Sequence, residues 1–342
     1  MPTIYIAGAS SGAGTTAVTT GIATLLAKKG VAVTLIKAGH VGSSTNLDAD
    51  AAFHNTLFPT NAPPVGWPVA IEHDANATVL DGIARNLKEV ALPAGLTLVE
   101  GVSGNISDSE RHTIDATLAE ALDARVILVS SYAAASPAQV AQVFGNRLIG
   151  TIVNSVPDHG KHVAETVLVA AFLAQDIQVL GLLPENRRML APTVADVAEH
   201  LGADVINRNG LTSPDTQLRE LVEHFMLGGL FLDKGAYVFG RRENKAVIVR
   251  GDRPDLQMAA LDTSTVCLIL TNNKPPVQYI THHAQLRQVP MLAVSAPTME
   301  TMEKLHSIGD RVSVHSAHKS QCFAELLETH CDLESLTALA AI

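Results

Sequence analysis

The chain has 342 residues, of which 47% are hydrophobic and 17% charged, and its formal net charge is -10. This is ordinary composition for a folded globular protein, and the length favours two domains over one. The 24 Lys and Arg residues are scattered among 34 Asp and Glu residues. This argues against a nucleic-acid-binding surface, so we expect no DNA or RNA partner.

Cysteine usage and hydropathy indicate the compartment. The three cysteines show no C-x-x-C spacing, which is typical of a reducing environment and gives no zinc signature. No apolar run is long enough to cross a bilayer, and the residues after Met1 lack a secretory signal pattern. We therefore expect a cytoplasmic protein that does not bind membranes. The fourteen histidines, His315 among them, lack metal-ligand spacing, so structural or solvent-exposed roles are predicted for them.

The first two hundred residues alternate short apolar runs with helical patterns. Strands are predicted at 3–7, 31–36, 96–99, 126–129, 149–153 and 179–183. Helices are predicted at 15–29, 78–91, 110–123, 136–144 and 160–175. Most of the strand candidates are continuously apolar, as expected for parallel strands that are covered on both faces. The pattern predicts a doubly wound α/β domain with a mostly parallel sheet.

The segment GASSGAGTTA, residues 8–17, lies where the first predicted strand meets the first predicted helix. Glycines let several backbone N–H groups converge, and the N-terminus of a helix attracts anions, so this segment is predicted to bind phosphate. The residues predicted to form this nucleotide cradle are Gly8, Gly12, Ala13, Gly14, Thr15 and Thr16.

The predicted loop departs from a common phosphate-binding loop at one position. Thr16 stands where the loop hydroxyl binds Mg²⁺, but Thr15 replaces the usual lysine. Because the lysine charge acts mainly on the transferring phosphate, its loss is expected to affect hydrolysis more than binding. The alternative is a turn of small residues that binds nothing.

A second set of elements follows a segment rich in Asn, Gly, Ser, Pro and Asp, which is linker composition. Helices are predicted at 216–226, 254–263, 276–288 and 298–307, and strands at 246–250, 266–271 and 290–294. The chain is thus predicted to comprise a nucleotide-binding domain, a linker, a smaller α/β domain and a C-terminal helical segment, at 1–204, 205–215, 216–320 and 321–342.

In the smaller domain, Asp252 and Arg253 precede a predicted helix. An arginine at a helix N-terminus can bind a phosphate or a carboxylate with two parallel hydrogen bonds. We therefore predict Asp252 and Arg253 as ligand-binding residues of this domain. The alternative is that Asp252 only caps the helix that starts near Pro254.

Five motifs support a family resemblance. In chain order they are GASSGAGTT, LIKAG, DAD, LVEG and GTIVNSVP. They resemble the motifs of dethiobiotin synthetase and of the related N-terminal domain of long phosphotransacetylases. The later segment AVIVRGDRPDLQMAALDTSTVCLILTN resembles the DRTGG domain, a regulatory module that follows that N-terminal domain. The resemblance covers nearly the whole chain but includes no acetyl-transferring domain, so we do not expect phosphotransacetylase activity.

The resemblance implies a site for ATP or ADP with Mg²⁺. The implied metal ligands are Thr16, Glu100 and an acid of the Asp48/Asp50 pair. Lys37 matches a lysine that works beside the transferring phosphate, which makes it the candidate catalytic residue.

The resemblance also bears on recognition of the base and of the substrate. Asn154 matches a position that recognises adenine. Ala38 and the pair Ser10 and Ser11 replace residues that are usual in the synthetases, so no role in biotin synthesis is expected. By family analogy, and because symmetric dimers are the commonest assembly, we expect a homodimer.

Three functions remain open at this point. The first is a regulatory protein that binds an adenine nucleotide and senses a second ligand, or assembles with a partner enzyme, through the DRTGG-like domain. The second is an ATP-dependent carboxylase or ligase that uses an acyl-phosphate or carbamoyl-phosphate intermediate. The third is a scaffold whose loop is a relic.

Overall fold

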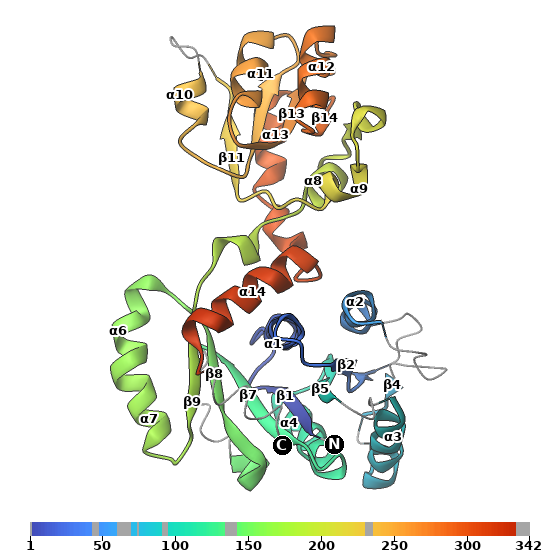
Figure 1. The fold of residues 1–342 in the computed structure, drawn as a ribbon, viewed down its shortest axis with the longest axis vertical. Coiled ribbons are helices and arrows are strands. Elements are labelled where there is room, and N and C mark those ends of the chain that lie inside the picture. The colour runs from blue at the N-terminus through green and yellow to red at the C-terminus, as the bar shows by residue number, and fades with distance from the viewer. Residues whose placement is uncertain are drawn as a thin grey trace. The chain divides into compact units, whose positions relative to one another are not determined.

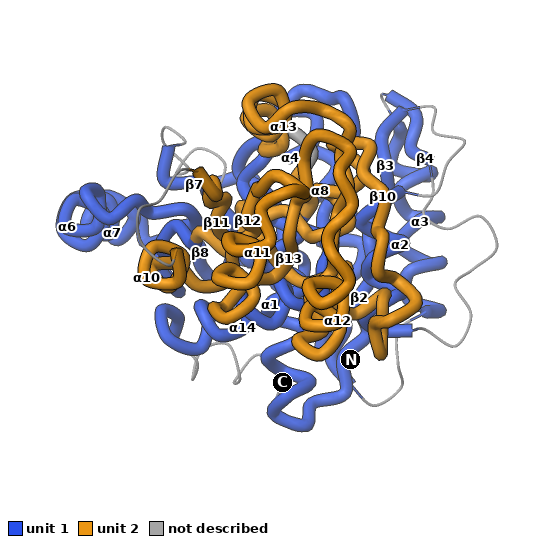
Figure 2. The backbone as a smooth tube through the Cα atoms, turned by 90° about the horizontal axis from the view of Figure 1, so that it is seen from above, with its two compact units in different colours: residues 1–186, 314–342 blue, residues 187–313 orange. Residues whose placement is uncertain are grey.

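The computed structural model describes residues 2–42, 48–59, 70–73, 75–90, 95–133, 142–229 and 235–332. Most of the predicted helix 136–144 lies outside the described residues. The chain divides into two compact units, which Figure 2 colours separately. Unit 1 contains residues 1–186 and 314–342, and unit 2 contains residues 187–313. None of the described helices is long and apolar enough to span a bilayer.

Unit 1 is built on a six-stranded sheet (Figure 1) with the strand order β2-β5-β1-β7-β8-β9. All neighbouring pairs are parallel. The strands are β1 (Thr3–Gly8), β2 (Val33–Lys37), β5 (Leu96–Glu100), β7 (Arg125–Ser131), β8 (Leu148–Val156) and β9 (Val179–Pro184). The prediction of a mostly parallel, doubly wound sheet is confirmed.

Helices cover both faces of this sheet. Helices α3 (Ala77–Val90) and α4 (Asp108–Ala121) pack in one core cluster with Tyr5, Ile36 and Val99. Because alternate residues of a strand point to opposite faces of the sheet, the opposite face also needs a cover. There α1 (Thr15–Lys28) packs against β2 and β5. The C-terminal helix α14 (Ala317–His330) lies along α1 (Figure 1). Gly21 permits this approach, because a Cβ there would lie 2.8 Å from the Phe323 ring.

Short elements complete unit 1. The strands β3 (His40–Val41), β4 (Ala70–Ile71) and β6 (Ser103–Gly104) form a small sheet in the order β4-β3-β6. Helix α2 comprises Ala49–Leu57. The predicted helix 160–175 consists of α6 (Lys161–Val163), a π-helical turn over Ala164–Leu168, and α7 (Val169–Leu173).

Unit 2 contains a five-stranded sheet with the order β10-β14-β13-β12-β11. The strands are β10 (Asp204–Val205), β11 (His224–Leu227), β12 (Lys245–Arg250), β13 (Thr265–Thr271) and β14 (Met291–Ala293), and only β10 pairs antiparallel. The helices are α8 (Val194–Leu201), α9 (Pro214–Leu218), α10 (Ala236–Phe239), α11 (Pro254–Leu261), α12 (Gln278–Leu286) and α13 (Thr298–Leu305). Two apolar clusters cover the sheet. The unit is therefore a second, smaller α/β fold, as predicted.

The boundaries of the compact units differ from the predicted domain boundaries. Unit 2 begins at Arg187 because α8 packs its apolar side chains into the same cluster as β12 and β13. The predicted linker 205–215 instead joins this sheet, where β10 pairs with β14 and the buried Asn207 bonds the backbone of Val289 and Met291. Residues 314–342 belong to unit 1.

One predicted helix is wrong. The segment 216–226 is not continuous, because α9 ends at Leu218 and β11 begins at His224. Strand β11 pairs in parallel with β12, with His224 opposite Lys245. Pairing with the sheet edge therefore prevails over the local helical spacing.

Candidate functional site

The glycine-rich segment forms the turn between β1 and α1 in unit 1. Gly14 precedes α1 with φ 88° and Gly12 has φ 74°, a left-handed conformation that side chains disfavour. A Cβ on Gly14 would overlap the Asn154 amide. A Cβ on Gly8 would lie 2.8 Å from Thr15 Oγ1. The Thr15 hydroxyl therefore packs against the end of β1, where it brings no charge to the loop.

Polar side chains hold the backbone of this loop. His112 Nε2 lies 3.2 Å and 3.1 Å from the carbonyl oxygens of Gly8 and Ala9. Asn154 Nδ2 donates to the Ala13 carbonyl at 3.1 Å. Burial lowers the pKa of His112, although its bonds to the two carbonyls oppose this shift. In this structure Asn154 thus braces the loop, and adenine recognition by it stays a prediction.

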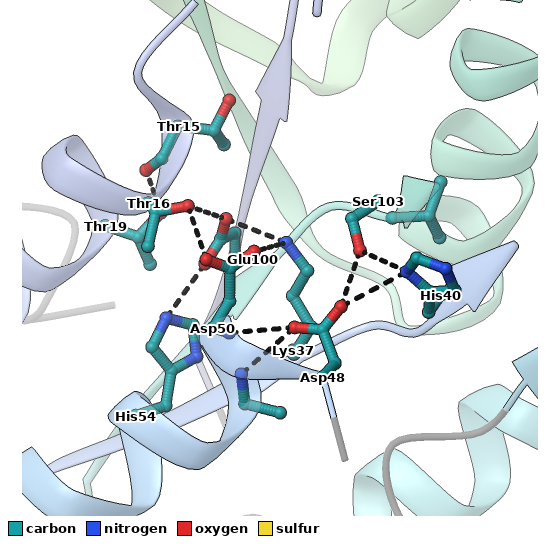
Figure 3. Close-up of polar contacts among 12 residues, drawn as sticks. Thr15, Thr16, Thr19, Lys37, His40, Asp48, Asp50, His54, Glu100 and Ser103 are labelled. Carbon is teal, nitrogen blue, oxygen red and sulfur yellow. Dashed lines mark hydrogen bonds and ion pairs between the residues drawn. The ribbon is translucent and has the colours of Figure 1, made fainter. Parts of the chain in front are cut away.

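Four residues predicted from motifs far apart in the sequence meet at the start of α1 (Figure 3). The Thr16 hydroxyl oxygen lies 2.7 Å from Glu100 Oε1 and 3.2 Å from Asp50 Oδ1. Lys37 Nζ donates to Glu100 Oε1 at 2.8 Å and to Asp50 Oδ2 at 2.9 Å. Lys37 and Glu100 are paired residues at the ends of β2 and β5, so their side chains leave the sheet on the same side.

The charges of this cluster are interdependent because the groups are buried. Burial alone would lower the pKa of Lys37, but the Glu100 and Asp50 carboxylates outweigh it and raise that pKa well above its usual value. Burial alone would raise the pKa values of Asp50 and Glu100, but Lys37 and neighbouring histidines lower both. Lys37 is therefore a permanent cation, suited to stabilising phosphate charge and unsuited to accepting a proton.

Two histidines that were not predicted extend this cluster. His315 Nε2 contacts Asp50 Oδ1 at 2.7 Å, and its ring lies 5.3 Å from that of Phe53. His54, on α2, places Nε2 2.8 Å from Glu100 Oε2, although the two atoms are not aligned as a hydrogen bond. A structural or solvent-exposed role was predicted for His315, and the structure adds its contact with Asp50, a candidate metal ligand.

Asp48 lies in a neighbouring polar group. Its Oδ1 accepts from the backbone N–H groups of Asp50 and Ala51, so it is the N-cap of α2. Its Oδ2 accepts from Ser103 Oγ at 2.8 Å and lies 3.3 Å from His40 Nδ1, as Figure 3 shows. Of the predicted acid pair, Asp50 is the member beside Thr16 and Glu100.

The donor set around Thr16 fits Mg²⁺ in chemical type. One hydroxyl and two carboxylates converge there, and Mg²⁺ prefers such oxygen ligands together with phosphate oxygens and water. Among the described residues, Glu100 Oε2 is buried and has no hydrogen-bond partner, although His54 Nε2 lies 2.8 Å away without being aligned as a hydrogen bond. Within the described ranges, no three or more His, Cys, Asp or Glu side chains form a metal site by themselves. A cation here would therefore also need the Thr16 hydroxyl and oxygens of a bound phosphate ligand.

A hollow of about 340 Å³ opens over the loop. It is lined by the loop backbone, by the Lys37, Asp50 and Glu100 cluster, by Ser103 and Gly104, and by Arg111 and Val314. Its size falls within the range of small-molecule sites. Arg111, on α4, was not predicted from the sequence.

The predicted ligand residues of unit 2 are engaged in local ion pairs. Asp252 accepts from Arg250 at 2.9 Å and 2.6 Å, and Arg253 donates to Asp255 at 2.9 Å and 2.7 Å. Asp252 does not cap α11, because the N-cap residue is Arg253 and no side chain caps that end. Ligand binding by Asp252 and Arg253 stays a prediction.

Comparison with known proteins agrees with this organisation. A family model described as "AAA domain" matches residues 2–193, and one described as "DRTGG domain" matches residues 196–308. The phosphate acetyltransferase of Haemophilus influenzae is 26% identical over 301 residues, which cover 75% of this chain and 40% of that protein. The phosphate acetyltransferase of Nitrosomonas europaea is 25% identical over 366 residues, 98% of this chain and 51% of that protein.

Among solved structures, the MinD cell division protein of Aquifex aeolicus resembles this chain with a TM-score of 0.39 and 16% identity, over 56% of this chain and 85% of that one. The chain spans about half the length of the curated relatives it matches. The AAA model covers the N-terminal part of unit 1, and the DRTGG model covers most of unit 2. The chain therefore belongs to the phosphotransacetylase N-terminal-like family, in which an AAA domain with a phosphate-binding loop is followed by a DRTGG domain.

Proposed function

We propose that this protein binds an adenine nucleotide with Mg²⁺ in the hollow of unit 1 and acts as a regulatory protein. The observation that carries the proposal is the convergence of Thr16, Asp50, Glu100 and Lys37 at the start of α1. These side chains supply oxygen ligands for a metal and one fixed cation. Bound Mg²⁺ would neutralise phosphate charge, and the loop amides would hold the phosphate oxygens.

The regulatory part of the proposal follows from the cation that the loop lacks and from the second unit. With Thr15 in place of lysine, the loop lacks a charge that acts mainly on a transferring phosphate, so phosphate transfer is weakened more than phosphate binding. The DRTGG domain forms a separate compact unit, which we propose senses a second ligand or binds a partner enzyme. The relatives' acetyltransferase activity is not carried over, because the chain spans only about half of each relative.

Thermal unfolding tests nucleotide binding directly. A ligand that binds only the folded state raises the midpoint by mass action, so Mg²⁺ with ATP or ADP should raise the midpoint of the full chain. The variant Thr16→Ala, which loses one proposed metal ligand and keeps the loop backbone, should show a smaller Mg²⁺-dependent rise in the unfolding midpoint. If isothermal titration detects no binding of ATP or ADP at millimolar concentration in the presence of Mg²⁺, the proposal is wrong.

A second candidate is an ATP-dependent carboxylase or ligase, and buried Lys37 is the observation that favours it. Its permanent charge beside the loop suits a phosphate that is being transferred to an acid. Phosphate release above a control without enzyme, lost in Lys37→Ala, would favour this candidate. If ATP binds but no phosphate is released when carboxylic acids are added, or when amines are added together with carbon dioxide, the regulatory function is favoured.

A further inference from the structure

Arg111 is a buried cation that lines the hollow from α4. Only 8% of its side chain is exposed, and it borders the same space as the glycine-rich loop. Its Nη1 donates to Asp108 Oδ1 at 2.6 Å. Among the described residues this is the only hydrogen bond of the guanidinium group. A guanidinium carries five N–H donors, so this bond leaves donors that can serve a ligand in the hollow.

The same carboxylate oxygen also binds the loop. The Ser11 backbone N–H donates to Asp108 Oδ1 at 3.2 Å. One anionic oxygen is thus held by a loop amide and by a guanidinium group, which is the donor set that binds a phosphate oxygen. The Asp108 side chain is half exposed, so it is free to rotate into solvent when another anion arrives.

An ordinary surface ion pair does not explain this geometry. Arg147 and Asp123 form such a pair at 2.9 Å, in which the side chains are 29% and 90% exposed. Arginine is rarely buried unless its charge is compensated, and an exposed partner such as Asp108 compensates it only in part. Asp115, one turn further along α4, is another carboxylate that interacts with the charge of Arg111, but it is held by Tyr5 and Val102. The burial of Arg111 at the loop therefore favours a further anion in the hollow.

We propose that Arg111 and the Ser11 amide form a phosphate-binding subsite of this loop. Arg111 supplies the positive charge that Thr15 lacks, and the Asp108 carboxylate occupies the subsite until a phosphate group of a nucleotide displaces it. The ligand class is a nucleoside polyphosphate, so this inference rests on the proposed nucleotide-binding function. No covalent bond is broken in the exchange, which replaces the hydrogen bonds of one oxyanion by those of another.

Isothermal titration of the full chain with Mg²⁺ and ATP tests the subsite. Arg111→Gln should weaken ATP binding by about tenfold or more, as expected for the loss of a hydrogen bond between charged groups. Arg147→Gln removes an arginine from an exposed ion pair outside the hollow and should bind like the wild type. Asp108→Asn keeps the shape of the side chain, removes the competing charge, and should bind ATP more tightly. Thr15→Lys combined with Arg111→Gln should recover part of the lost affinity.

The outcomes separate this inference from the function on which it rests. If the wild type binds no nucleotide, the proposed function fails. If the wild type binds ATP and Arg111→Gln binds it equally well, the subsite is wrong and nucleotide binding stands. Unchanged or weaker binding by Asp108→Asn would also contradict the displacement of its carboxylate. Thermal unfolding of the variants without ligand shows whether Arg111→Gln still folds. If Arg111→Gln does not fold, Asp108→Asn, at a half-exposed position, tests the proposal instead.

Discussion

Asp115 is a buried carboxyl group whose ionisation should contribute measurably to the pH dependence of stability. The side chain, on α4, is fully buried. Its Oδ1 accepts from the Tyr5 hydroxyl at 2.6 Å and from the Val102 N–H at 3.0 Å. Oδ2 has no hydrogen-bond partner among the described residues. Burial raises the pKa of Asp115 from 3.8 to about 6, although the Tyr5 hydrogen bond opposes the shift.

The sign and size of the effect follow from this shift. Because the pKa of Asp115 is higher in the folded state, its contribution to stability is fully present below the unfolded pKa and is lost as pH rises through the folded value. A shift of about two units at about 1.4 kcal/mol each corresponds to roughly 3 kcal/mol. Asp115→Asn keeps an oxygen acceptor for Tyr5 and Val102 and has no charge to bury. Most of this difference, about 2.5 kcal/mol, should appear as a rise in the stability of the variant relative to the wild type between about pH 4 and pH 7.5.

Urea unfolding of the full chain, followed by circular dichroism across this pH range, measures the difference. Subtracting the wild type from the variant cancels the groups they share, including Asp50 and Glu100, whose lowered pKa values act in the opposite direction. Asp123→Asn is the matched control, because Asp123 is 90% exposed and should give no gain as pH rises. A difference between Asp115→Asn and the wild type that does not vary with pH would refute the reasoning.

The remaining predictions concern the loop. Thr15→Lys should tighten ATP binding more than ADP binding in isothermal titration, because the added ammonium acts on the phosphates farthest from the ribose. Chelation of Mg²⁺ should weaken ATP binding in the wild type much more than in Thr16→Ala, and equal losses in the two proteins would show that Thr16 is not a metal ligand. Gly14→Ala should destabilise the protein more than Gly12→Ala in urea unfolding, by about 1 kcal/mol or more. Both glycines have positive φ, but only the Gly14 substitution displaces Asn154, whereas a Cβ on Gly12 meets nothing within 4 Å. Equal losses would mean that the Asn154 contact is unimportant.

Much of the fold could be predicted because both sheets are mainly parallel. Parallel strands that are covered on both faces are continuous apolar runs, and such runs mark β1, β5 and β7 with bounds close to those observed. Strand β11 could not be predicted in the same way. Its four residues lie at the edge of the sheet, three of them half-buried and Leu227 exposed, so neither length nor burial separates them from a helical pattern.

The limits of the two units could not be predicted, because an apolar helix face does not specify the sheet that it covers. Helix α8 follows the last strand of unit 1 after one short 3₁₀ turn, yet its buried residues pack in unit 2. Helix α14 lies at the far end of the chain, and it packs on α1. These are long-range contacts, and the local pattern of each helix is the same whichever sheet it covers.

Some residues of the candidate site could be predicted from the sequence, and others could not. Lys37 and Glu100 were implied by the family resemblance, and they meet because the ends of parallel strands lie on one edge of a sheet. His315 could not, because 265 positions separate it from Asp50 and nothing in the sequence around it indicates a ligand. Arg111 lies in a helix of mixed polar composition, and only its burial against the loop distinguishes it from an ordinary surface arginine.

The charge balance of the hollow links these residues to the question that Thr15 raises. Among the described residues, the charged side chains that line the hollow are two cations, Lys37 and Arg111, and two acids, Asp50 and Glu100. Their formal charges cancel. A lysine at position 15 would leave a surplus positive charge for the phosphates, but threonine leaves none. A nucleotide polyphosphate must therefore bring its own counter-ion, and the hydroxyl and carboxylate oxygens beside Lys37 are suited to hold one. If the proposed site binds a nucleotide, we expect the missing lysine to make that binding depend on the metal and on Arg111, and both dependences can be measured without any assay of catalysis.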